Sequence, residues 1–402
     1  MRSVEEHQRV VTGLIQARTP VAVALPDAEG LTLAADVTAP LSLPVFDNSA
    51  MDGYAVRAAD VAAAEPGSPV RLPVVEDIPA GRTDRLTLAP GTAHRIMTGA
   101  PVPDGATAVV PVELTDAGVE IVAIAAAPKP GQHIRRAGED VTVGTTVLRS
   151  GQIVSPAALG LAAALGLSEL TVVPRQRVLV VSTGSELIPA GTALRPGQIY
   201  ESNGIMLAAA VREAGAEVAG VATCGDDADQ FRAVLAAYAG RCDLVITSGG
   251  VSAGAYEVVK DAFGPGDGTG VQFVKVAMQP GMPQGAGTLA DGRGIVALPG
   301  NPVSALVSFE VFLRAALRAA MGMPDPHRPH RSATLAEAIT SPAGKRQFRR
   351  GVYDPATGTV ASYGPPASHH LRWLATANCL LDVGPDVTGI SAGEPVEIWD
   401  LA

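Results

Sequence analysis

Two glycine-rich loops carry the clearest chemical signal in this chain, TSGGVSAG at 247–254 and ALPGNPVSA at 297–305. An apolar run typical of a buried strand precedes each loop, at 243–248 and 294–299, and a helix-like segment follows it. A strand that ends in glycines and opens a helix leaves unpaired backbone N–H groups and the positive end of a helix dipole at one place. Such places bind phosphate and other oxyanions. Two of them in one α/β unit predict a ligand with more than one anionic group.

Acidic side chains follow two other predicted strands of the same region. The loop STGSEL at 182–187 holds Glu186, and GDD at 225–227 holds Asp226 and Asp227. Each acid has a second interpretation, as a solvated loop residue or as an acid that favours a helix N-terminus. Because these acids share a sheet edge with loops suited to phosphate, we predict a divalent cation between carboxylate and phosphate, with Mg²⁺ as the metal.

Further polar clusters lie outside that region. PVFDNSAMDGYAVR at 44–57, RIMTGAPVP at 95–103 and RRAGED at 135–140 combine charged residues with turn-forming ones. Turn chemistry or surface ion pairing explains any one of these clusters alone. KRQFRRG at 345–351 is a dense basic cluster in an otherwise acidic sequence, and it suits an anion.

Length, charge and cysteine content narrow the class of protein. A chain of 402 residues is long enough for about two to four domains. Its net charge of −10 argues against non-specific binding to nucleic acid or to an anionic membrane. Cys224, Cys242 and Cys379 have no metal-site spacing, which is typical of packed thiols in a reducing compartment. With no secretory leader and no apolar run of about 20 residues evident, we expect a cytoplasmic protein.

The elements that must position these residues change in character along the chain. Apolar spacing predicts a helix over 3–17, short β-type runs fill about 20–150, and a second helix follows at 155–166. From Arg177 onward strands and helices alternate, which predicts a parallel, doubly wound sheet with its ligands beyond the carboxyl ends of the strands. Within this sheet region we expect Asn203 to cap a helix.

The last part of the sheet region and the chain beyond it are also predictable. A helix is expected over Tyr256–Phe263, and Pro302 begins the long helix that closes the region. The proline-rich stretch at 322–331 predicts a linker. Strand-like runs and turns after it predict a small β-barrel or sandwich.

Taken together, these motifs resemble the molybdopterin molybdenumtransferase family, called MoeA in bacteria, to which the C-terminal domain of gephyrin and the E domain of a plant homologue belong. The motifs on which this resemblance rests occur in the same order as in the family: PVFDNSAMDGYAV, RIMTGAPVP, RRAGED, STGSEL, QIYESN, TSGGVSAG, LPGNPVSA and FRRG with SHH. They run from about residue 44 to 380 and cover nearly the whole chain. One glycine loop is weak evidence, whereas so many ordered motifs are highly specific.

The resemblance implies a multidomain α/β plus β architecture in four parts. An elongated N-terminal domain, 1–44 and 136–174, is interrupted by a β-rich domain of irregular topology at 45–135. A molybdopterin-binding, doubly wound α/β domain covers 175–322, and a small C-terminal β-barrel domain covers 323–402. Such proteins are homodimers in which the α/β domain of one subunit and the N-terminal domains of the other share the active cleft.

The reaction implied by the resemblance belongs to molybdenum cofactor biosynthesis. Molybdenum from molybdate is inserted into adenylylated molybdopterin and AMP is released, with Mg²⁺ as cofactor. The implied catalytic residues are Asp52, Asp140, Glu186, Glu257 and Lys275, of which Asp52 and Asp140 reach the cleft from the partner subunit. The implied metal ligands are Glu186, Asp226 and Asp227. The implied substrate-holding residues are Thr98, Arg135, Thr183, Gly184, Ser248, Gly249, Gly250, Ser252, Pro299, Gly300, Asn301, Pro302, Ser304, Arg350 and Ser368.

The resemblance also implies partners other than small molecules. These are transient contacts with molybdopterin adenylyltransferase and with apo-molybdoenzymes, and neither nucleic acid nor a membrane is among them. The chain departs from the family pattern at Gln279 and Met282 in the run QPGMP, where many members have lysines, and at Ala255 and Glu257, where aspartates are usual. These changes remove positive charge from the anion site and lengthen one carboxylate arm.

Two competing interpretations stay open at this point. The adenylyltransferase that makes the nucleotide intermediate has a similar α/β domain, but an enzyme of that kind does not need residues 1–174 or 323–402. A binding scaffold like gephyrin uses this same fold, but the sequence shows no extra domain or long linker that would favour it.

Overall fold

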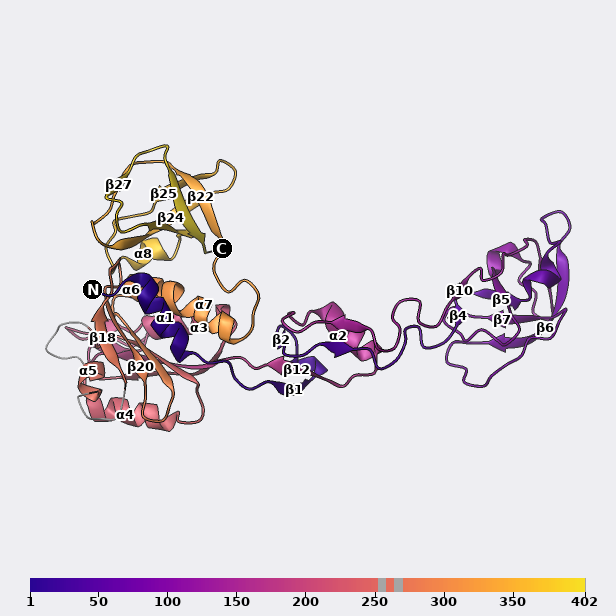
Figure 1. Cartoon of the computed structure of the whole chain (residues 1–402), viewed down its shortest axis with the longest axis horizontal. Coiled ribbons are helices and arrows are strands. Elements are labelled where there is room, and N and C mark those ends of the chain that lie inside the picture. Colours follow the sequence, from indigo (N-terminus) through magenta and orange to yellow (C-terminus); the bar gives the residue numbers. More distant parts are fainter. Residues whose placement is uncertain (252–257, 264–269, 402) are drawn as a thin grey trace.

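The protein is elongated, with an α/β body at one end, a narrow middle unit, and a β-rich distal unit at the other end (Figure 1). The structure is a computed structural model that describes residues 1–251, 258–263 and 270–401. The last part of the chain forms a small barrel on the body, and both chain ends lie on this side of the molecule. The chain therefore leaves the body after its first helix, runs out to the distal unit and returns.

The body is built on a six-stranded sheet in the order β16-β13-β17-β21-β20-β18. In chain order its strands are Arg177–Thr183 (β13), Glu217–Cys224 (β16), Leu244–Ser248 (β17), Gln272–Lys275 (β18), Pro283–Thr288 (β20) and Gly294–Leu298 (β21). The strands β16, β13, β17 and β21 are parallel, and β17 and β21 are buried along their whole length. Parallel strands with helices on both faces have to be buried in this way. The predicted doubly wound parallel sheet is confirmed for these four strands.

Helices cover both faces of this sheet. They are Val4–Leu14 (α1), Asn203–Glu213 (α3), Ala228–Ala237 (α4), Val258–Ala262 (α5) and Pro302–Ser308 (α6), which continues through the π-helical turn Phe309–Arg314 (η4) into Ala315–Ala320 (α7). One core joins the sheet to α1, α3, α6 and α7, and a second core joins its other face to α4 and α5. The predicted first helix is confirmed, although α1 ends at Leu14, and a capping box of Ser3 and Glu6 begins it.

Two details of the body correct the predictions. Strands β20 and β18 run antiparallel to their neighbours, so the sheet is mixed at one edge. The pattern does not predict β20, PQGAGT, because its glycines interrupt the apolar run, and a Cβ on Gly287 would lie 2.4 Å from the carbonyl oxygen of Gly270. The N-cap of α3 is Ser202, so the prediction that Asn203 caps this helix is wrong. The Asn203 side chain instead donates hydrogen bonds to Ser248 and Gly300, at the ends of two neighbouring strands.

The middle and distal units are mostly β-structure, as predicted for about 20–150. The middle unit holds Val21–Ala24 (β1), Thr32–Leu33 (β2), Val37–Thr38 (β3), Thr146–Leu148 (β11), Glu169–Val173 (β12) and the helix Pro156–Ala164 (α2), which confirms the predicted second helix. The distal unit holds Asn48–Ser49 (β4), Gly53–Val56 (β5), Val70–Ile78 (β6), Ala93–Ile96 (β7), Ala108–Pro111 (β8), Ile121–Ile124 (β9) and Ile134–Arg135 (β10). Its main sheet has five strands in the order β8-β5-β7-β6-β9.

The C-terminal strands form the small barrel that the sequence predicts. They are His330–Leu335 (β22), Ile339–Thr340 (β23), Arg346–Asp354 (β24), Thr359–Ser362 (β25), Cys379–Val383 (β26), Gly389–Ile390 (β27) and Pro395–Asp400 (β28), with the short helix Leu371–Leu374 (α8). The order β24-β25-β22-β28-β26 closes on itself because β26 also pairs with β24. Strand Met278–Gln279 (β19) of the body adds to β24, so main-chain hydrogen bonds join body and barrel.

Every helix in residues 1–251, 258–263 and 270–401 is too short or too polar to cross a lipid bilayer.

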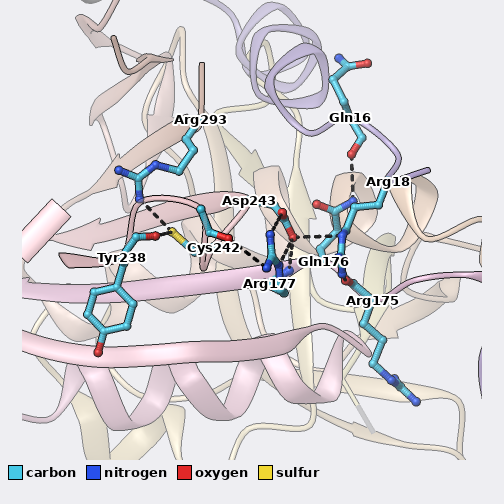
Figure 2. Close-up of polar contacts among 10 residues, drawn as sticks. Gln16, Arg18, Arg175, Gln176, Arg177, Tyr238, Cys242, Asp243 and Arg293 are labelled. Carbon is cyan, nitrogen blue, oxygen red and sulfur yellow. Dashed lines mark hydrogen bonds and ion pairs between the residues drawn. The ribbon is translucent and has the colours of Figure 1, made fainter. Parts of the chain in front are cut away.

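An ion-pair cluster around Asp243 lies at the amino edge of the body sheet (Figure 2). The Arg177 guanidinium donates to both oxygens of the Asp243 carboxylate, at 3.1 and 2.7 Å, and the Arg177 N–H donates at 2.8 Å. The Arg18 Nε lies 3.5 Å from the same carboxylate. Burial raises the pKa of Asp243, but the hydrogen bonds from Arg177 and the two guanidinium charges outweigh this and leave the pKa below its ordinary value.

The same cluster joins the two chain segments that connect the body to the middle unit. The Arg18 side chain donates to the carbonyl oxygen of Arg175 at 2.7 Å, and the Gln176 side chain donates to the carbonyl oxygen of Gln16 at 2.9 Å. Asp243 therefore helps to hold the outgoing and returning segments against the sheet. Figure 2 shows these side chains converging from both segments and from the start of β17.

Asp243→Asn is expected to lower the free energy of unfolding by about 2 kcal/mol at pH 7, since hydrogen bonds to charged groups are worth roughly 1.5–3 kcal/mol. A carboxylate whose pKa is lowered on folding adds stability above its unfolded pKa of about 3.9, and this stability is lost as the pH falls through the folded pKa. The difference between the two proteins should therefore stay constant from about pH 8 to 5 and shrink below about pH 4.

Urea unfolding at several pH values measures this difference. Asp229→Asn is the control, because the Asp229 side chain is 91% exposed in its ion pair with Arg232. A surface pair of that kind contributes about 0–1 kcal/mol. An Asp243→Asn protein as stable as the control would contradict the assigned role of Asp243.

Candidate functional site

A cavity of about 680 Å³ opens at the carboxyl ends of β13, β17 and β21. The strand register places Ser182 beside Ser248 and Ser248 beside Leu298, so the loops after these residues start side by side. We call this space the carboxyl-edge cavity. It is lined by Ser182, Thr183, Gly184, Glu186, Leu187, Ile199, Tyr200, Glu201, Ser202, Asn203, Asp226, Ser248, Gly249, Gly250, Val251, Pro283, Pro299, Gly300, Asn301 and Pro302. Its position is the one that a doubly wound sheet favours for ligands.

The first glycine loop requires glycine for its shape. Gly249 and Gly250 have φ angles of 97° and 66°, a left-handed region that favours glycine. A Cβ on Gly249 would lie 2.7 Å from the carbonyl oxygen of Thr183. The Gly249 N–H donates to the carbonyl of Leu298 at 3.0 Å, so a ligand would not find it free. The N–H groups of Gly250 and Gly300 have no partner among the described residues and are available to an oxyanion.

Two of the three predicted metal-binding carboxylates line this cavity. Glu186 folds back over Gly184, where a Cβ would lie 2.6 Å from the Glu186 Oε2. Asp226 accepts a hydrogen bond from the Ser185 N–H at 3.2 Å. Asp227 instead caps α4, because its carboxylate accepts hydrogen bonds from two backbone N–H groups at the start of that helix.

The donor set suits Mg²⁺ only in combination with a ligand. Within the described part of the chain, no group of three or more Asp, Glu, His or Cys side chains lies close enough together to hold a metal ion. Mg²⁺ in phosphate sites is usually held by one or two carboxylates, by waters and by the phosphates themselves. Glu186 and Asp226 fit that pattern.

Glu201 is a buried acid of this site that the sequence patterns do not single out. It is 9% exposed, and its Oε1 accepts hydrogen bonds from the Ser182 hydroxyl and from the Gly204 N–H, both at 2.7 Å. The carboxylate therefore joins the end of β13 to the first turn of α3. It also lines a second cavity of about 700 Å³, which shares Gly184 and Leu187 with the first. Its position in QIYESN, just before a predicted helix, is the sequence signal that could have identified it.

The sequence-predicted residues Asp52 and Thr98 lie together in the distal unit. Thr98 donates its N–H and its hydroxyl to the Asp52 Oδ1, at 2.6 and 2.8 Å. These hydrogen bonds lower the pKa of Asp52 below its ordinary value. Arg135 and Asp140 are exposed. Figure 1 shows the middle unit between the distal unit and the body, so these four residues lie far from the carboxyl-edge cavity of their own chain.

The barrel reaches the rim of the cavity through Ser368. The Asn301 side chain donates to the Ser368 hydroxyl oxygen at 2.8 Å, and the Val303 N–H donates to the Ser368 carbonyl at 3.1 Å. Arg350 is 4% exposed and does not line the cavity. Its guanidinium donates to the carbonyl oxygens of Pro365, Ala367 and His370, and so it shapes the segment that carries Ser368.

The remaining predicted residues lie outside the cavity lining. Lys275 is exposed on the edge strand β18, and Ser304 is buried in α6. Ser252, Ala255 and Glu257 lie outside the described residues. Gln279, which stands where many family members have lysine, accepts a hydrogen bond from the Gln347 side chain of the barrel at 2.9 Å.

Three family models match successive parts of the chain. The MoeA N-terminal region (domain I and II) matches residues 2–166, the probable molybdopterin binding domain matches 179–319, and the MoeA C-terminal region (domain IV) matches 332–401. The matches follow one another along the chain in this order.

Relatives and solved structures agree with these models over the full length. Molybdopterin molybdenumtransferase 2 of Mycobacterium tuberculosis is 69% identical over 405 residues, which cover 100% of each chain. Molybdopterin molybdenumtransferase 1 of the same organism is 38% identical and covers 100% of this chain and 99% of its own. A crystal structure of the molybdopterin biosynthesis MoeA protein from Pyrococcus horikoshii has a TM-score of 0.82 at 28% identity, covering 100% of this chain and 99% of that one.

Gly249→Ala is expected to lower the affinity for inorganic pyrophosphate in Mg²⁺ buffer by at least about tenfold. An alanine at this positive φ angle would strain the first glycine loop by roughly 1–3 kcal/mol and so disturb its shape. Titration calorimetry measures this affinity. Gly292→Ala is the matched control: Gly292 has a φ angle of 87° and no atom near its Cβ position, in a turn before β21 at the opposite sheet edge. Equal losses of affinity in both variants would show that general strain, not the loop, is responsible.

Proposed function

Because this chain belongs to the molybdopterin molybdenumtransferase (MoeA) family, whose members are transferases of molybdenum cofactor biosynthesis, we propose that its substrates are adenylylated molybdopterin and molybdate. We further propose that the reaction depends on Mg²⁺ and releases AMP. The observation that carries the proposal is the carboxyl-edge cavity. It brings two glycine turns, whose Gly250 and Gly300 N–H groups have no partner among the described residues, and the carboxylates of Glu186 and Asp226 to one space of about 680 Å³.

The charge of this cavity supports a metal-dependent reaction of a phosphate ligand. Three carboxylates line it, those of Glu186, Glu201 and Asp226, and no Lys or Arg is among the described lining residues. An anionic ligand beside these carboxylates would be repelled by several kcal/mol at distances near 4 Å unless a cation lay between them. Bound Mg²⁺ would neutralise phosphate charge and polarise the bridging oxygen.

The proposed chemistry has two balanced parts. In one, water attacks the molybdopterin-side phosphorus of the phosphoanhydride, the bond from that phosphorus to the bridging oxygen breaks, AMP leaves with the bridging oxygen, and the protons of the water are released to solvent. In the other, the two dithiolene sulfurs bind molybdenum, and one molybdate oxygen leaves as water with the two thiol protons. No electron is transferred in either part. The chain's own groups act by binding: the Gly250 and Gly300 N–H groups would hold phosphate oxygens, and Glu186 and Asp226 would hold Mg²⁺ when it is bound.

We propose that the distal unit of a second copy completes the cavity in a homodimer. Asp52 is held in place by Thr98, yet it lies far from the carboxyl-edge cavity of its own chain. Large apolar side chains are exposed on both parts, Val45 and Phe46 in the distal unit and Ile199 and Ile205 beside the cavities. Exposed apolar groups of this kind mark protein interfaces. We also propose transient contacts with molybdopterin adenylyltransferase and with apo-molybdoenzymes.

AMP release from adenylylated molybdopterin should require both molybdate and Mg²⁺. Asp52→Asn and Glu186→Gln should each lower its rate by at least about 100-fold, equal to about 2.7 kcal/mol of transition-state stabilisation, with folding intact. Asp386→Asn, an exposed change in the barrel, is the control and should retain the rate. Tight binding of the substrate by the wild-type protein without AMP release at any molybdate concentration would favour a binding scaffold instead.

Mixing the two inactive variants should restore activity if the cleft is shared. Random re-pairing of Asp52→Asn and Glu186→Gln subunits makes half of the dimers mixed, each with one intact cleft, so about one quarter of wild-type activity is expected. AMP release after co-refolding or co-expression measures it. Activity no higher than in the separate variants would place both residues in a cleft of one chain.

A further inference from the structure

The side chain of Asn203 links the two glycine turns of the carboxyl-edge cavity. Its Nδ2 donates to the Ser248 hydroxyl oxygen and to the Gly300 carbonyl oxygen, both at 2.6 Å. Ser248 is the last residue of β17 and leads into the first turn, and Gly300 lies in the turn that follows β21. One amide group therefore joins segments that are separated by about fifty residues of chain, as the numbers of Ser248 and Gly300 show.

The orientation of this amide follows from its partners. A carbonyl oxygen only accepts hydrogen bonds, so the group that faces Gly300 has to be the NH₂ end of Asn203. The Asn203 Oδ1 is buried and has no partner among the described residues. Asn203 is the first residue of α3, but its side chain does not cap the helix, whose N-cap is Ser202. The Asn203 side chain therefore forms its hydrogen bonds with the two turns and not with its own helix.

Asn203 is itself held in place by the rest of the sheet edge. Two residues earlier, the buried Glu201 carboxylate binds the Ser182 hydroxyl at the end of β13 and the Gly204 N–H of α3, both at 2.7 Å. The position of Asn203 is therefore fixed relative to β13, and through its Nδ2 relative to the loops after β17 and β21. The three strand ends form one hydrogen-bonded unit.

A second hydrogen bond already joins the loops, from the Gly249 N–H to the Leu298 carbonyl at 3.0 Å. It continues the ladder between β17 and β21 and fixes the backbone only as far as Leu298. Gly300 lies two residues farther on, where Asn203 provides the restraint. Because a peptide group is planar and trans, anchoring the Gly300 carbonyl also sets the direction of the following N–H, that of Asn301.

We propose that Asn203 is a positioning residue that sets the spacing of the two glycine turns, so that both can hold phosphate groups of one diphosphate-type ligand. This inference rests on the proposed function, in which the ligand carries a phosphoanhydride. A ligand with one phosphate needs only one turn and is insensitive to their spacing. A ligand with two phosphates needs both turns at the correct distance.

The test compares inorganic pyrophosphate with inorganic phosphate in Mg²⁺ buffer, using the full-length protein. Asn203→Ala should weaken pyrophosphate binding at least about tenfold and phosphate binding less than about threefold by titration calorimetry. Arg212→Ala, an exposed change in the last turn of the same helix, is the control and should alter neither. Equal losses for the two anions, or no loss for pyrophosphate, would overturn the role of Asn203 in spacing.

Hydrogen exchange tests the positioning without a ligand. In Asn203→Ala the hydrogen-bonded amides that flank the two turns, those of Gly249 and Val303, should exchange at least about tenfold faster than in the wild type, while those of the barrel keep their rates. Asn203→Asp should reproduce this, because a carboxylate has the same shape but cannot donate to the Gly300 carbonyl. Unchanged exchange in both variants would overturn the inference. Failure of the wild-type protein to bind pyrophosphate would instead count against the proposed function and leave the exchange result to decide the positioning.

Discussion

The hydrogen-bonded register of β13, β17 and β21 is the constraint on which the rest of the site depends. It places Ser182, Ser248 and Leu298 in one row, so that three loops leave the sheet at the same level. A shift of one residue in any of these strands would move its side chains to the opposite face of the sheet. Burial of β17 and β21 on both faces makes such a shift costly, because each strand is packed between two hydrophobic cores.

This register brings several acidic side chains close together, and their charges have to be balanced by hydrogen bonds or by a cation. Glu201 is satisfied by a hydroxyl and a backbone N–H, and Asp227 is satisfied by the start of α4. Glu186 and Asp226 are left facing a space without a lysine or arginine among its described lining residues. A cavity that combines carboxylates with N–H groups that have no partner among the described residues suits an anion only together with a cation. The electrostatics of the site and its proposed metal dependence therefore follow from the same arrangement.

The extended shape of the chain adds a second constraint. The distal unit carries Asp52, whose position is set by Thr98, but the middle unit keeps it away from the body (Figure 1). The direction of the middle unit is set where Arg18 and Arg175–Arg177 contact the sheet and Asp243 (Figure 2). The angle at this junction would govern where a partner's distal unit lies in a dimer. In the proposed homodimer, an ion pair far from the cavity would therefore bear on the geometry of the shared cleft.

The sequence by itself determined the parallel strands, the two glycine loops and the family, because apolar runs, glycines and ordered motifs are local patterns. Only the tertiary structure decided that Asp226 faces the cavity and Asp227 caps a helix, since neighbouring residues of the same type differ in direction and not in pattern. The same holds for Arg350, whose basic character suited an anion but whose buried guanidinium binds backbone carbonyls. Asn203 shows the reason most clearly. Its partners come from two loops distant in sequence, and no local pattern encodes which side chain will span the gap between them.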